Sequence, residues 1–118
     1  MATKLASLGY EVVLMDRQGS GDLAVRSRRT GSGFRVFVRG LVSRNAWLVR
    51  PVLEGEDVYY VLTILDEDRY FVLSRREAVA ERDQTLTRLG RPADYPRHGF
   101  TYGAGLAYEN RWGSLPPA

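Results

Sequence analysis

Seven arginines and no acidic residue lie between Leu23 and Leu53, and this stretch carries the clearest chemistry in the sequence. The seven are Arg26, Arg28, Arg29, Arg35, Arg39, Arg44 and Arg50. A guanidinium group stays charged at physiological pH and presents a planar set of donors that suits phosphate oxygens. Charge of one sign over such a stretch favours a polyanionic partner, and nucleic acid is the commonest polyanion.

The overall charge of the chain is ordinary, so the distribution of charge matters more than its total. The 118 residues carry a formal net charge of +3, and only one of the 17 basic residues, Lys4, is a lysine. A GC-rich genome favours arginine codons over lysine codons. On that explanation the arginines of this stretch form only a solvated basic face. Codon bias does not explain the absence of acids, however, so contact with nucleic acid and a solvated face both remain open.

Composition excludes several classes of site. The chain has no cysteine, so it can form neither disulfides nor thiolate metal sites. Its single histidine, His98, cannot build a multi-histidine metal site by itself. No apolar run approaches membrane-spanning length. The run of residues 1–9 ends at Gly9 and is too short to act as a signal peptide. We therefore expect one cytoplasmic domain over residues 1–118, with no membrane partner.

Alternation of apolar and polar residues predicts strands over much of the chain. The expected strands are 10–15, 22–27, 34–39, 46–50, 58–64, 70–73 and 100–102. Helices are expected at 2–8, 75–89 and 104–112. The helix at 75–89 should begin at a capping box, because Ser74 is followed three residues later by Glu77. Polar, glycine-rich turns should separate the first three strands.

The alternation also sorts the chemistry-bearing side chains onto faces. On the strand 22–27, Asp22 should share a face with Arg26, and on the strand 34–39, Arg35, Phe37 and Arg39 should share a face. Asp22 follows a glycine at a strand start, a position that is typical of a turn-forming aspartate. Its carboxylate could also pair across the strands with Arg35 or Arg39.

The order of short motifs resembles the restriction-endonuclease-like superfamily, the PD-(D/E)xK nucleases. A helix end precedes the strand Gly9-Tyr10-Glu11-Val12, a glycine-rich turn leads to Gly21-Asp22-Leu23, and Val36-Phe37-Val38-Arg39 follows. The resemblance continues through 47–50, 59–62 and 70–73 and ends at 108–116, so it covers most of the chain. It is strongest to small nuclease-like and Holliday-junction-resolvase-like members. It implies a strand-rich α/β fold, a restriction-endonuclease-like mixed β-sheet flanked by helices.

The same resemblance implies a degenerate active site. Such nucleases hold Mg²⁺ with a first aspartate and with an acid two residues before a lysine on the next strand. Asp22 matches the first aspartate, Phe37 stands at the acid position and Arg39 at the lysine position. Phenylalanine has no oxygen for a hard cation. Asp22 and Arg39 are therefore expected to be vestigial catalytic residues, with no cofactor bound.

From these observations we expect a nucleic-acid-binding domain that no longer cuts, with DNA as the partner, acting in restriction, repair or phage defence. The expected contact residues are Arg26, Arg28, Arg35, Phe37, Arg39 and Arg44, with the Phe37 ring stacking on a base or sugar. One alternative is an active Mg²⁺-dependent endonuclease that binds metal at Asp22 with a second acid from elsewhere, Glu11 or Asp16 first. Another is a protein-interaction or inhibitor module that holds a protein partner or a second copy of itself.

Overall fold

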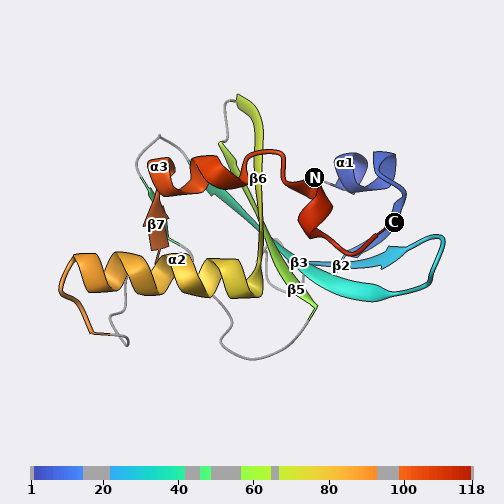
Figure 1. Cartoon of the computed structure of the whole chain (residues 1–118). Coiled ribbons are helices and arrows are strands. Elements are labelled where there is room, and N and C mark those ends of the chain that lie inside the picture. The colour runs from blue at the N-terminus through green and yellow to red at the C-terminus, as the bar shows by residue number, and fades with distance from the viewer. Residues whose placement is uncertain are drawn as a thin grey trace.

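A computed structural model of the chain describes residues 2–14, 22–41, 46–48, 57–64, 67–92 and 99–117 (Figure 1). A mixed five-stranded sheet in the order β1-β2-β3-β5-β6 forms its centre. The strands are β1 (Tyr10–Leu14), β2 (Asp22–Ser27), β3 (Gly33–Leu41), β5 (Val58–Ile64) and β6 (Glu67–Ser74). Neighbouring strands are antiparallel except for β3 and β5, which run parallel.

The remaining elements flank this sheet. The helices are α1 (Ala2–Ser7), α2 (Arg75–Arg88) and α3 (Tyr102–Gly105), with two 3₁₀ turns, η1 (Leu106–Tyr108) and η2 (Trp112–Ser114). Strands β4 (Ala46–Leu48) and β7 (Gly99–Thr101) pair in a separate antiparallel sheet. The expected strand-rich, mixed α/β fold is therefore confirmed, while the assignment to the restriction-endonuclease-like fold stays a prediction.

The sheet carries a separate hydrophobic core on each face. On one face, which we call the α2 face, Tyr60, Phe71 and Leu73 pack with Ala78 of α2. On the other, the α1 face, Leu5 of α1 packs against Val36, Val72 and the C-terminal Leu115. Figure 1 shows α2 and α3 on one side of the sheet, and α1 with both chain ends on the other. Alternation along each strand produces both cores, because successive side chains point to opposite faces.

Helix α2 begins where the sequence predicts. The Ser74 hydroxyl accepts a hydrogen bond from the Glu77 N–H at 3.2 Å, and the Glu77 carboxylate accepts one from the Ser74 N–H at 2.9 Å. These two bonds satisfy donors that would otherwise lack partners in the first turn. The helix stops after Arg88, and Gly90 adopts a left-handed φ of 66°, which a glycine allows at little cost.

A tight turn joins β2 to β3 and holds the tip of this basic hairpin. Buried Ser27 accepts from the Gly31 N–H at 2.9 Å through its carbonyl, and its hydroxyl accepts from the Thr30 N–H at 3.2 Å. Gly31 has a φ of 77°, in the left-handed region that favours glycine. The turn therefore fixes Arg28 and Arg29 on the outside of the hairpin.

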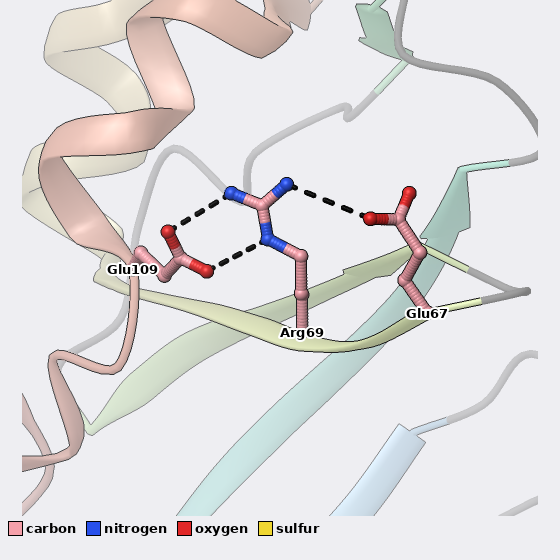
Figure 2. Close-up of polar contacts among 3 residues, drawn as sticks. All are labelled: Glu67, Arg69 and Glu109. Atoms are coloured by element: carbon pink, nitrogen blue, oxygen red, sulfur yellow. Dashed lines mark hydrogen bonds and ion pairs between the residues drawn. The ribbon is translucent and has the colours of Figure 1, made fainter.

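The C-terminal part differs from the helix expected at 104–112. After η1 the chain leaves the helical conformation, and Glu109 forms an antiparallel bridge with Phe71 on the edge of β6. In Figure 2 the Glu109 carboxylate accepts two hydrogen bonds from the Arg69 guanidinium, at 2.8 and 2.9 Å. The Glu67 carboxylate lies 3.7 Å from the other side of the same guanidinium. Pairing with the sheet edge and with Arg69 outweighs helix continuation. Trp112 and Leu115 then pack on the sheet.

Candidate nucleic-acid interface

The register of β2 with β3 brings together the positions at which the sequence resembles the nuclease motif. Asp22 is the cross-strand partner of Phe37, and Arg35 and Arg39 lie two residues either side of Phe37 on the same strand. Both arginines therefore occupy the diagonal positions around Asp22, where long side chains can interact across an antiparallel pair. The expectation that these four residues share one face of the hairpin agrees with this register.

Phe37 occupies a different environment from the one expected for a base-stacking residue. Its side chain is buried, only 8% exposed, and its ring stacks on Tyr60 of the adjacent strand with centroids 5.5 Å apart. The guanidinium carbons of Arg35 and Arg39 lie 5.5 and 5.6 Å from the same ring centroid. With its faces taken by these neighbours, the ring has no room for a base, so we leave Phe37 out of the binding surface.

Five arginines of the acid-free stretch lie in the described part of the chain. They are Arg26 on β2, Arg28 and Arg29 in the turn, and Arg35 and Arg39 on β3. All are exposed except Arg39, which is half-buried and donates to the Val38 carbonyl at 2.9 Å. Arg28 donates to the Tyr10 carbonyl at 3.4 Å. Arg44 and Arg50, like Asp16, lie outside the described residues.

Glu11 pairs with Arg26 and is separated from Asp22. The two lie opposite each other in the β1–β2 register, and their side chains form an ion pair at 2.5 Å. The hydrogen bond from Arg26 lowers the pKa of Glu11, and the bond to Glu11 raises the pKa of Arg26. Arg26 is four residues from Asp22, so the register sets Glu11 about 13 Å along the sheet from Asp22. Glu11 is therefore poorly placed to share a metal ion with Asp22.

A hollow opens on the α2 face above β1, β2 and the start of β3. Helix α2 packs against β5, β6 and β7, so this part of the face is not covered by it. The hollow has a volume of about 510 Å³. Val13 on its wall is 55% exposed. We call this surface the basic hollow; its lining includes Val13, Ala24, Arg26, Gly33, Arg35, Asp57 and Val58.

A second, smaller hollow of about 240 Å³ adjoins the first and shares Asp57 and Val58 with it. It is lined further by Ser74, Arg75 and Arg76 at the start of α2. Asp57 stands between the two hollows with a left-handed φ of 32°, and its carbonyl accepts a bond from the Arg35 N–H at 2.8 Å. The charged lining residues that the structure describes are thus four arginines and one aspartate.

Sequence reasoning missed the part of this surface that comes from outside the acid-free stretch. Arg75 and Arg76 follow the helix cap directly, and Val13 is an apolar residue on the polar side of its strand. The adjacent arginines were a visible feature, but their place beside β3 depends on the pairing of β5 with both β3 and β6.

No protein-family model, curated protein or solved structure matches this chain. Within the described residues, no group of three or more His, Cys, Asp or Glu side chains could hold a metal ion. Among the same residues, no helix is long and apolar enough to cross a membrane.

Proposed function

We propose that this chain is a nucleic-acid-binding domain whose contacts come from the β2–β3 hairpin and the basic hollow beside it. One observation carries the proposal: the five arginines of the acid-free stretch that the structure describes all retain at least partial exposure, and all but Arg39 are exposed. Exposed arginines without acidic neighbours in sequence create a positive potential that attracts phosphates.

The proposal includes a relationship to metal-dependent nucleases without their hydrolysis. The antiparallel β1–β2–β3 unit after a helix, and a later helix that returns to the sheet, support a restriction-endonuclease-like fold. Phe37, opposite Asp22, supports loss of cutting, because a buried aromatic ring stands where an active member needs an oxygen ligand. We place the function in the cytoplasm, with DNA as the partner, within restriction, repair or phage defence.

Binding should be measured by fluorescence anisotropy with a labelled 20-mer, single-stranded or as a duplex, at about 50 mM salt, where phosphate contacts are strong. Replacing Arg28, Arg29 and Arg35 together with glutamine should weaken binding steeply. Each lost phosphate contact should reduce the slope of log affinity against log salt by about 0.9 for duplex DNA.

A matched control removes the same charge from another part of the surface. Arg88, Arg91 and Arg111 are exposed and lie outside the two hollows. Their triple replacement by glutamine should weaken binding far less. Both triple variants lose the same net charge, but this one keeps the proposed phosphate contacts. Equal weakening by the two triple variants would contradict the proposed site, and no binding of DNA or RNA at this salt would contradict the function itself.

Cleavage tests the second half of the proposal. We expect no Mg²⁺- or Mn²⁺-dependent cutting of plasmid, linear or branched DNA, because a single carboxylate at Asp22 among arginines holds a dication weakly. The reaction is followed on gels against a nuclease standard. Cutting by the unaltered protein that Asp22→Ala abolishes would instead establish the active, metal-dependent endonuclease.

A further inference from the structure

We infer that the basic hollow receives an unpaired nucleobase, so that the domain prefers single-stranded or locally unwound nucleic acid to intact duplex. The inference rests on the proposed nucleic-acid binding and deepens it by naming the form of the partner. It comes from the shape and lining of the hollow, whereas the proposed binding comes from the arginines.

The hollow has the size and position of a small-ligand site. Its volume of about 510 Å³ lies inside the range of about 300–1,000 Å³ usual for pockets that take small organic groups. Its floor is the face of a β-sheet, an arrangement that offers a flat surface to a flat ring. In a duplex the bases are stacked on one another and paired, so only an unpaired base can present a ring face to such a floor.

The floor of the hollow is apolar. Val13 and Ala24 are cross-strand partners on β1 and β2, and Val58, the first residue of β5, also lines the hollow. Val13, on the edge strand β1, leaves 55% of its surface exposed. Aliphatic side chains and glycine can pack against the flat face of any base by burying apolar surface, and such contact requires no particular base sequence.

The rim supplies the charge that selects a nucleotide over an uncharged ligand. Arg35 is exposed and, in the described part of the chain, has no carboxylate partner. Its guanidinium can stack on the outer face of a base or bind the adjoining phosphate. Arg75 and Arg76 line the adjoining hollow, where the sugar-phosphate backbone of the bound nucleic acid can continue. Charge complementarity therefore favours a nucleic-acid strand over a second copy of this basic chain as the occupant.

Gly33 provides a way to fill the hollow without changing its charge. It is the cross-strand partner of Arg26, so a side chain added there projects from the same face of the sheet. A Cβ at Gly33 would meet only the Val25 carbonyl oxygen, at 3.8 Å, which is an ordinary contact. The backbone is that of an ordinary β-strand, where valine is favoured. Gly33→Val should therefore fold, and Ala24→Leu offers a second, independent way to fill the space.

The experiment compares a labelled single-stranded DNA 20-mer with the matching duplex, both at the same salt, for the wild type, Gly33→Val and Ala24→Leu. Thr87→Val, at an exposed position on α2, is the control for added aliphatic surface. The wild type should bind the single strand more tightly. Both filled variants should lose about tenfold in single-strand affinity, the equivalent of one base contact, while their duplex affinity changes less than about twofold.

Each outcome decides one claim. Equal effects of filling on both probes, or none on either, overturn the base site while leaving the arginine contacts intact. Absence of binding to either probe overturns the proposed function together with this inference. If instead the wild type sediments as a dimer and Gly33→Val as a monomer, the hollow is an interface between copies, and the inference is wrong.

Discussion

Two arginines of the β2–β3 hairpin, Arg29 and Arg35, have different surroundings from two of the C-terminal half, Arg69 and Arg82. In the C-terminal half, Arg69 lies between Glu109 and Glu67, and Arg82, only 7% exposed, donates to Asp83 at 2.6 Å. On the hairpin, Arg29 and Arg35 are exposed and have no carboxylate partner within the described residues. Arg69 holds the segment at Glu109 against β6, and Arg82 is engaged within α2. Arg29 and Arg35 are available to a ligand.

Another polar group of the C-terminal half, the Tyr108 hydroxyl, is also engaged in a hydrogen bond within the protein. The Tyr108 hydroxyl donates to the Glu81 carboxylate at 2.7 Å, which ties η1 to α2. Burial and this neighbouring carboxylate raise the pKa of Tyr108 to about 12. A tyrosine held neutral in this way acts as a fixed donor, so this bond serves the fold, whereas Arg29 and Arg35 of the hairpin keep exposed charge.

Phe37 lies on the boundary between the two regions, and its replacement should have the largest effect on stability. Phe37→Ala removes a buried ring from between Tyr60, Arg35 and Arg39, and should cost about 3–5 kcal/mol of unfolding free energy. Denaturant unfolding measures this cost, with Phe37→Leu as a milder variant that should remain folded. A Phe37→Leu protein with unchanged stability that no longer binds DNA would return Phe37 to the nucleic-acid site.

The locally determined features were predictable from the sequence. Strand alternation assigned Leu23 and Asp22 to opposite sides, and the Ser74 and Glu77 pair located the start of α2. Such features depend on residues within a few positions of each other, so one sequence is sufficient to read them.

The environment of the site was not predictable, because it depends on pairing between distant segments. Burial of Phe37 requires that β3 run parallel to β5, with Tyr60 in register beside it. The basic hollow exists because α2 covers β5 and β6 and does not reach Val13 on β1. The change of course at Glu109 likewise needs Arg69, forty residues earlier in the chain.

The smallest expected effect concerns two ion pairs that look alike, one in each region. The Glu109–Arg69 pair is bidentate, with side chains 30% and 23% exposed, and it fixes a chain segment to β6. The Glu11–Arg26 pair is 44% and 56% exposed and joins two strands that are already hydrogen-bonded. Exposed pairs contribute little to stability. Glu109→Gln should therefore lower the urea midpoint at pH 7 more than Glu11→Gln does.

Acidification gives the sharper form of this test. The hydrogen bond from Arg69 lowers the pKa of Glu109 below its ordinary value of 4.5. A carboxyl group with a lowered folded-state pKa stabilises the fold above its unfolded-state value, and this contribution is lost as pH falls through the folded-state pKa. The difference in urea midpoint between wild type and Glu109→Gln should accordingly shrink between pH 7 and an acidic pH below the lowered folded-state pKa of Glu109, where its carboxyl group is protonated. If the two glutamine variants instead show equal urea midpoints at both pH values, the Glu109–Arg69 pair stabilises the fold no more than the Glu11–Arg26 pair does. The proposed contrast between the two regions would then be wrong.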